Sequence, residues 1–307
     1  MLSRIADSLF WIGRYLERAE DTCRIVDVHL QQRLDDPHVD QPKAARHLLE
    51  LMGAPATAEE PDVLHTMCYD EASPASFLAA LAGARESARR ARETVPTDVW
   101  ESINTTWLAV RGGRLQRMRP ASMFKLIRER CAVIAGLADS TMTHDEGWMF
   151  LVLGRSIERV DMTARLISTP SLGTNTTRAW GHVLSGCGAH HAFVQRYGAL
   201  ADDRQAAEFL MRDKLFPRSL VATLMAAEQS LRALAPPSER RPGGDDVAAR
   251  LLGGARAGLE FMPPDEVLSA LPDKMADLQL ACSRATDAIS RRYFEGASAA
   301  EWVGGAW

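Results

Sequence analysis

Two copies of one charged pattern, Gly-Arg-x-x-Glu-Arg, contain the side chains best suited to chemistry. They occupy residues 13–18 and 154–159, so a shift of 141 positions superposes them. Guanidinium groups bind carboxylates and phosphates through paired hydrogen bonds. A glutamate placed among them can orient them or exchange a proton. The candidate ligand-binding residues are Arg14, Arg18, Arg155 and Arg159, and the candidate acid–base residues are Glu17 and Glu158.

The match between the two copies continues beyond the motif. Apolar residues at alternating spacings of three and four superpose as well, but any two packed helices share such a stripe. Matched charges are harder to explain in that way. We therefore interpret the chain as two repeated halves, at about 1–140 and 141–295. The further matched pairs are Glu20 with Asp161, Thr22 with Thr163, and Arg24 with Arg165.

The charged face of each motif helix is expected to be partly covered by other helices. The apolar stripe of the first copy is centred near Ile12, yet Phe10 lies on the opposite arc, as Leu151 does in the second copy. Gly13 and Gly154 would let a neighbouring backbone approach closely, although glycine costs about 1 kcal/mol of helix propensity relative to alanine. The alternative is a solvated face whose ion pairs contribute little. The duplication favours a buried or cleft-lining network, which needs its own carboxylates or an anionic ligand.

Helical periodicity dominates the chain and strand signals are nearly absent. One helix over 3–33 would be roughly 45 Å long, and a second motif helix, capped by Thr143 or Asp145, is expected to end before Pro170. The fold class that we predict is all-α: a multi-helix bundle in one domain over 1–295, with the motif helices near its centre. A flexible loop is expected at 235–244 and a loosely ordered tail at 296–307. Further helices are expected at 44–52, 75–94, 99–110, 120–137, 178–197, 204–212, 217–234, 245–259 and 271–294.

The composition narrows the function classes. Of the 307 residues, 46% are hydrophobic and 25% charged, which is typical of a globular protein, and the net charge of -4 argues against a nucleic-acid or membrane-surface binder. Five scattered cysteines without CxxC spacing indicate neither a zinc site nor a disulfide framework, so we expect a reducing cytoplasm. HExxH, P-loop, GxSxG and Rossmann patterns are missing, and neither a metal nor a cofactor is expected.

Three other segments could bind an anion. Arg85 lies on a helical face with other arginines and glutamates, where a solvated ion-pair surface is favoured. The segment 111–130 holds seven basic residues and one acidic residue, and it is about equally a solvated face or a landing surface for phosphate or an acidic partner. Pro217 marks a helix start with Arg218 and Ser219 in its first turn, where free amides and an arginine would suit an anion. A plain helix-start signal explains these residues equally well.

Several stretches together resemble the bacterial alpha-E family, which is named for its all-helical prediction and its Glu-Arg motif. They are LFWIGRYLERAEDTCRIVDV at 9–28, TMTHDEGWMFLVLGRSIERVDMTARLI at 141–167, ARESARRARETVPTDVWESIN at 84–104, FLMRDKLFPRSL at 209–220 and ISRRYF at 289–294. The resemblance covers essentially the whole chain. It implies association with circularly permuted ATP-grasp proteins, often with a transglutaminase-like protease and an N-terminal-nucleophile hydrolase. Such a system would make, modify and trim a peptide or amide-linked product.

Three functional hypotheses follow. The preferred one is an accessory or partner subunit of an ATP-grasp-type ligase system, whose Arg/Glu-lined cleft binds the carboxylate or phosphate of a peptide or small acidic ligand. The second is a stand-alone enzyme that uses Glu17 or Glu158 as its general base. The third is a helical scaffold in which the charges are purely architectural.

Overall fold

The computed structural model describes residues 1–35, 40–56, 62–169, 176–198, 202–236, 246–263 and 266–295. For residues 176–178 only the backbone is described. The expected loop at 235–244 lies outside these ranges from residue 237 onward, and the expected tail at 296–307 lies wholly outside them.

Regular structure in these ranges is helical throughout, which confirms the predicted all-α fold. No helix among them is long and apolar enough to cross a bilayer. Most are short amphipathic helices that bury one face, whereas the helix over 3–35 has 33 residues and those over 120–141 and 146–168 have 22 and 23. The elements are α1 (Ser3–Asp35), α2 (Gln41–Leu51), η1 (His65–Tyr69), α3 (Phe77–Arg90), α4 (Thr97–Val110), η2 (Leu115–Arg117), α5 (Pro120–Thr141), α6 (Glu146–Ser168), α7 (Thr176–Gly186), α8 (His190–Tyr197), α9 (Asp203–Arg212), α10 (Leu220–Leu234), α11 (Val247–Glu260), α12 (Leu271–Ile289) and η6 (Ser290–Phe294).

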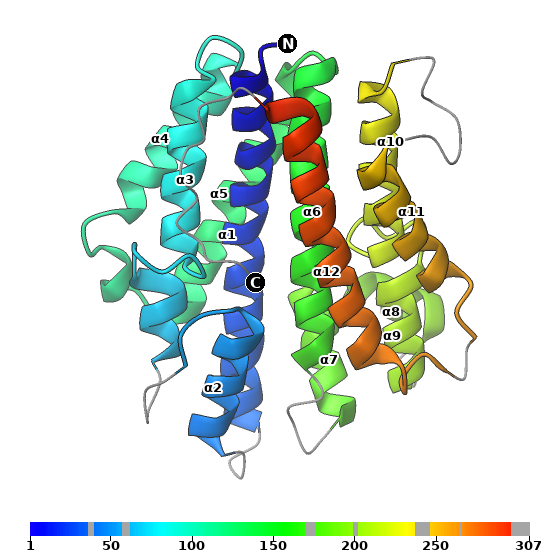
Figure 1. Ribbon diagram of the computed structural model, residues 1–307. Helices are drawn as coiled ribbons and strands as arrows, with labels where there is room; N and C mark the ends of the chain where they lie inside the picture. Colours follow the sequence, from blue (N-terminus) through cyan, green and yellow to red (C-terminus); the bar gives the residue numbers. More distant parts are fainter. Residues whose placement is uncertain are drawn as a thin grey trace.

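The two long motif helices, α1 and α6, lie side by side in the middle of the molecule, as Figure 1 shows. They run parallel, because the amino group of Met1 lies 3.3 Å from the carboxylate of Glu146 at the start of α6. Both helices are buried on more than one face, including their polar positions Glu17 and Glu158. The prediction that the motif helices occupy the centre is therefore confirmed.

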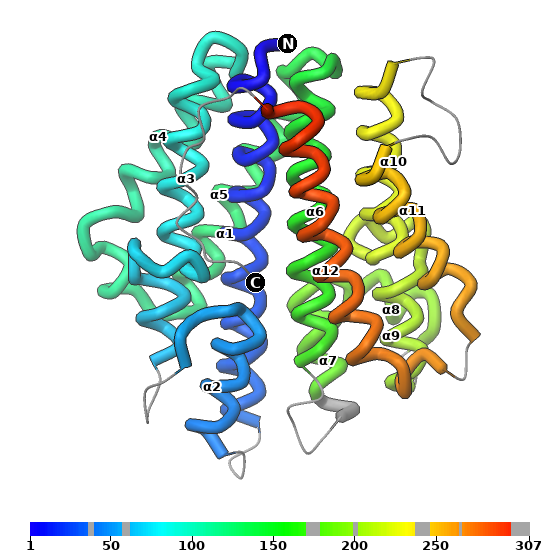
Figure 2. Tube along the Cα trace, in the orientation of Figure 1, coloured from blue at the N-terminus to red at the C-terminus, as the bar shows by residue number. Residues whose placement is uncertain are grey.

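The flanking helices give α1 and α6 corresponding neighbours. Helix α1 packs against α3 and α5, which are joined through α4, and α6 packs against α10 and α12, which are joined through α11. The short helices α2 and α7 lie at the far ends of α1 and α6, away from the N-terminus (Figure 2). This arrangement is compatible with two repeated halves, and the repeat stays a prediction.

Side-chain caps decide where several helices begin. Asp145 caps α6, as one of the two predicted alternatives, by accepting hydrogen bonds from the amides of Gly147 and Trp148 at 2.8 and 3.4 Å. Ser76 and Ser219 cap α3 and α10 through their hydroxyl groups. Those two helices therefore begin later than the expected positions 75 and 217.

The prediction of a single helix at 178–197 is wrong. The structure has two helices there, α7 and α8, separated after Gly186. Gly188 adopts a φ of +65°, in the left-handed region that ends an α-helical run and favours glycine. The apolar periodicity continues across the break, which is why it predicted one helix.

Candidate functional site

Helices α1 and α6 approach so closely at the two motifs that only glycine fits. A methyl group added to Gly13 would lie 2.1 Å from the backbone oxygen of Leu151, and one added to Gly154 would lie 2.0 Å from the backbone oxygen of Phe10. Phe10 and Leu151 are themselves matched positions of the two copies. The predicted close approach thus occurs, and each motif glycine faces the other motif's helix.

Glu158 of α6 is held by two arginines of α1. Its side chain is fully buried, with Arg14 Nε 2.6 Å from Oε2 and Arg18 Nε 2.5 Å from Oε1. Arg18 Nη2 also donates to Oε2 at 3.1 Å. Arg14 Nη1 donates to the hydroxyl of Thr286 in α12 at 2.8 Å, so this ion pair also fastens α12 to the central pair. Buried charge is tolerated here because each carboxylate oxygen receives charged donors.

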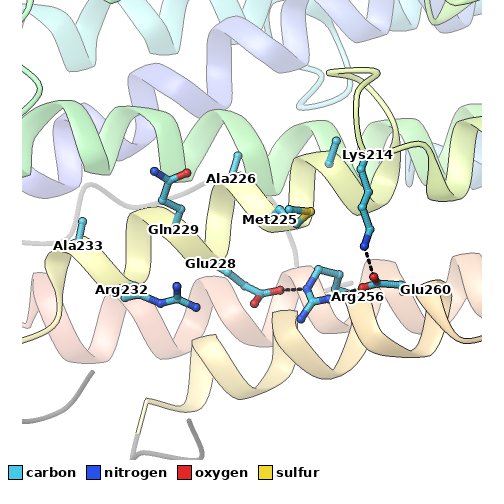
Figure 3. Close-up of a pocket in the computed structure, with 10 residues that line it drawn as sticks. Lys214, Met225, Ala226, Glu228, Gln229, Arg232, Ala233, Arg256 and Glu260 are labelled. Carbon is cyan, nitrogen blue, oxygen red and sulfur yellow. Dashed lines mark hydrogen bonds and ion pairs between the residues drawn. The ribbon is translucent and has the colours of Figure 1, made fainter. Parts of the chain in front are cut away.

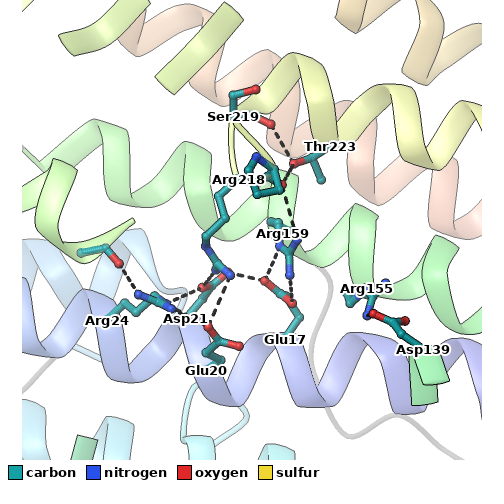
Figure 4. Close-up of polar contacts among 12 residues, drawn as sticks. Glu17, Glu20, Asp21, Arg24, Asp139, Arg155, Arg159, Arg218, Ser219 and Thr223 are labelled. Atoms are coloured by element: carbon teal, nitrogen blue, oxygen red, sulfur yellow. Dashed lines mark hydrogen bonds and ion pairs between the residues drawn. The ribbon is translucent and has the colours of Figure 1, made fainter. Parts of the chain in front are cut away.

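Glu17 of α1 has the reciprocal arrangement. Arg159 of α6 donates to both of its carboxylate oxygens, at 2.6 and 2.8 Å. Arg218 supplies a second guanidinium from the segment before α10, with Nη2 3.0 Å from Glu17 Oε1 (Figure 4). We call the five motif residues Arg14, Glu17, Arg18, Glu158 and Arg159, together with Arg218, the inter-helix clasp.

The arginines of the clasp keep both glutamates ionised. Burial alone would raise the pKa of Glu17, but Arg159 and Arg218 outweigh it and hold that pKa at about 2. Burial opposes ionisation of Glu158 in the same way, and Arg14 and Arg18 hold its pKa at about 2. Both carboxylates are therefore permanent anions at neutral pH, within a network that supplies its own counter-ions.

Asp21, one turn after Glu17, behaves in the opposite way. Burial raises the pKa of Asp21 to about 8, with Arg218 opposing the rise and Glu17 and Glu20 adding to it. Its Oδ1 pairs with Arg218, while its buried Oδ2 has no hydrogen-bond partner among the described residues. A carboxyl group so placed favours the neutral, protonated form.

Arg155 breaks the correspondence between the two motifs. It matches Arg14 in sequence, yet the second guanidinium beside Glu17 comes from Arg218. Arg155 Nη1 instead lies 3.3 Å from Asp139 of α5, whose side chain is 46% exposed. A small cavity of about 40 Å³ opens beside it between α1, α5 and α6, and both Arg155 and Arg159 line this cavity.

The structure separates the remaining predicted residues. Arg85 lies apart from the clasp, where its Nε donates to Asn104 of α4 at 2.8 Å. Arg218 belongs to the clasp, but not as a helix-start site: it precedes α10, whose N-cap is Ser219. The expectation that Arg218 and Ser219 lie in the first turn is wrong, since the serine hydroxyl already accepts from the first-turn amide of Ala222.

Matched arginines further along the motif helices make contacts that the sequence pattern alone could not assign. Arg24 of α1 donates to the carbonyl of Gly186 at the end of α7, at 2.8 Å. Arg165 of α6 donates to the carbonyl of Leu51 at the end of α2. Each motif helix thus holds the short helix that follows the other one. The repeated arginines were the available signal, but their acceptors are backbone groups.

A larger hollow lies away from the clasp, in a groove of about 860 Å³ between α10 and α11 (Figure 3). Arg256 of α11 joins the two walls through an ion pair with Glu228 of α10 at 2.5 Å, and it also pairs with Glu260 of its own helix at 2.5 Å. No sequence motif marks these residues, so they could not be predicted as a site. Volume alone does not make this groove a site, and we assign the chemistry to the clasp region.

The fold and the clasp define an all-helical protein organised by two interlocked Glu-Arg helices. The chain belongs to the Alpha-E family, described as a predicted alpha-helical domain with a conserved ER motif, whose model matches residues 1–294. The structure shows what the Glu-Arg pairs of this chain do: each glutamate binds the arginine of the other motif.

Similar proteins occur in mycobacteria. An uncharacterised protein of Mycobacterium bovis is 24% identical over 323 residues, which cover 94% of this chain and 36% of that protein. An uncharacterised protein of Mycobacterium tuberculosis strain H37Rv is 23% identical with the same coverage. The chain thus spans about a third of the length of the curated relatives that it matches. No solved structure matches it.

Proposed function

We propose that this chain is an accessory or partner subunit of an ATP-grasp-type peptide or amide ligase system, with a site at Arg155 for the carboxylate or phosphate of an anionic ligand. Membership of the Alpha-E family supports the choice of a ligase system. The resemblance to this family implies a circularly permuted ATP-grasp protein as one partner and a transglutaminase-like protease as another. The greater length of the mycobacterial relatives supports a role beside other domains.

The position of Arg155 is the observation that carries the ligand site. Arg14, its counterpart, is committed to buried Glu158 at 2.6 Å. Arg155 faces the cavity and pairs at 3.3 Å with half-exposed Asp139. Such a pair contributes only about 0–1 kcal/mol, so a ligand anion can replace Asp139 at little cost. Bidentate binding by the guanidinium would then select a carboxylate or phosphate.

Glu17 and Glu158 serve as fixed counter-ions in this proposal. A general acid or base works best with a pKa near the operating pH, whereas the pKa of each glutamate is held at about 2. The competing proposal, a stand-alone enzyme with either glutamate as its base, predicts turnover by the purified chain without a ligase. If the purified chain shows no turnover by itself but full activity when the ligase is present, the accessory role is favoured.

Reconstitution with a circularly permuted ATP-grasp protein from the same organism tests both parts of the proposal. Complex formation is measured by co-purification and product by mass spectrometry. Arg155→Met should leave the complex intact and reduce product formation by about tenfold or more, the loss expected when one charged ligand contact is removed. Asp139→Asn should retain activity, because it removes only the competing carboxylate.

The matched control is Arg89→Met, which removes an exposed, ion-paired arginine of α3. It should change neither complex nor product. If Arg155→Met lowers the melting temperature but leaves product formation intact, the proposal of a ligand site at Arg155 is wrong. If no complex forms with the ATP-grasp protein, the proposed partner role is wrong. A scaffold role would instead survive replacement of both charges, as in Arg159→Met with Glu17→Gln.

The location that we propose is the cytoplasm. All five cysteines are buried free thiols. Burial raises the pKa of several of them, including Cys68 and Cys187, so these thiols are protonated and poor nucleophiles. A reducing compartment suits such residues, and it is also where ATP-dependent ligation would take place.

A further inference from the structure

The connection between α4 and α5 carries an unusual concentration of exposed positive charge. It lies at the left edge of the molecule in Figure 1, away from the central helices. Together with the outer face of α5 it forms what we call the basic surface. Its exposed members are Arg111, Arg114, Arg117, Arg119, Lys125 and Arg130.

Most of these charges have no counter-ion in the part of the chain that the structure describes. Lys125 lies 3.7 Å from Glu129 on the same helix, and nearby Arg128 lies 3.0 Å from Asp27 of α1. For the five exposed arginines of the surface, by contrast, the described part of the chain provides no ion pair. Their guanidinium groups are therefore available to an outside partner, unlike those of the clasp.

The backbone holds this surface in a defined shape. Gly112 and Gly113 both adopt a φ of +77°, where other residues are strained, so they permit the reversal after α4. Leu115 is 1% exposed and anchors the connection in the core. Arg114 and Arg117 flank it in a 3₁₀ turn, where residues three apart lie on the same side.

We propose that the basic surface docks a short acidic segment of a protein partner. Guanidinium groups recognise carboxylates by paired hydrogen bonds. The segment 111–130 contributes +6 to a chain of net charge -4, so the rest of the chain carries -10. This negative charge around the basic surface limits the size of the ligand that can bind there. A short acidic peptide meets only the arginines, whereas a long nucleic acid or an anionic membrane would also face the acidic remainder. This inference does not depend on the ligase assignment.

Binding of a labelled oligo-glutamate peptide to the full chain tests the proposal by fluorescence anisotropy. The wild-type chain should bind it with a salt-dependent affinity. Arg114→Glu with Arg117→Glu should weaken binding by about tenfold or more, because two like charges would then face the peptide. The matched control is Arg204→Glu with Arg284→Glu, which makes the same charge change at exposed positions of α9 and α12.

The control should change affinity by less than about twofold at physiological salt, where charges more than about 8 Å away are screened. Circular dichroism should show both variants folded, since all four arginines are exposed. Equal weakening by the two variants would overturn the proposal, since it would show a non-specific charge effect. So would absence of peptide binding by the wild-type chain, or tighter binding of an oligonucleotide of matched charge.

Discussion

At the scale of single residues, the same helix holds carboxyl groups with opposite proton affinities. Glu17 receives two guanidinium groups on its oxygens and remains ionised. Asp21 lies one turn further along, where burial and the neighbouring anions Glu17 and Glu20 favour its protonated form. Arginines reach both oxygens of Glu17, whereas Oδ2 of Asp21 receives no hydrogen bond from the described residues. The sequence spacing could not specify this difference.

The raised pKa of Asp21 makes stability depend on pH. In the unfolded chain an aspartate titrates near about 3.9, whereas the pKa of folded Asp21 is about 8. Between these values the folded chain holds a proton that the unfolded chain has lost, so the free energy of unfolding falls as pH rises through this window. Asp21→Asn removes this titration. We expect urea unfolding to show a weaker fall with pH for this variant than for the wild type.

Asp139→Asn is the control for that measurement, because Asp139 is half-exposed and, among the described residues, pairs only with Arg155, at 3.3 Å. It should retain the wild-type pH dependence. Identical pH profiles for the wild type and Asp21→Asn would show that Asp21 is ionised in the folded chain, contrary to our account.

At the scale of elements, the spacing between α1 and α6 depends on the two motif glycines. Alanine at position 13 would place its methyl group 2.1 Å from a backbone oxygen of α6, so the helices must separate. We expect Gly13→Ala to destabilise the fold by about 2 kcal/mol or more, within the range of overpacking. Gly154→Ala should act similarly. Thermal and urea unfolding measure both.

Gly136 of α5 offers a matched control, since a methyl group there meets nothing within 4 Å. In that helical position Gly136→Ala should stabilise the chain by about 0.5–1 kcal/mol through helix propensity. Opposite signs at positions 13 and 136 would support the close approach. Stabilisation of the same size at both positions would contradict it.

At the scale of the whole molecule, the sequence predicted the all-helical fold and the central motif helices, because apolar periodicity and capping are local signals. It also predicted that Glu17 and Glu158 lie among arginines. It did not predict the different surroundings of Arg14 and Arg155, because these depend on Arg218, which lies some sixty residues after Arg155 in the sequence. Nor did it find the break at Gly188, since an apolar stripe continues through it.

The central claim is that each motif binds the other across the α1–α6 interface. A double-mutant cycle with Arg18→Met and Glu158→Gln measures this most directly, because the two side chains are 140 positions apart and 2.5 Å from each other. The same cycle for the exposed pair Glu86 and Arg89 is the control. Urea unfolding of the single and double variants gives each coupling free energy. We predict a coupling of about 1–3 kcal/mol for the clasp pair and about 0.3–0.5 kcal/mol for the control. A clasp coupling no larger than that of the control would contradict the account.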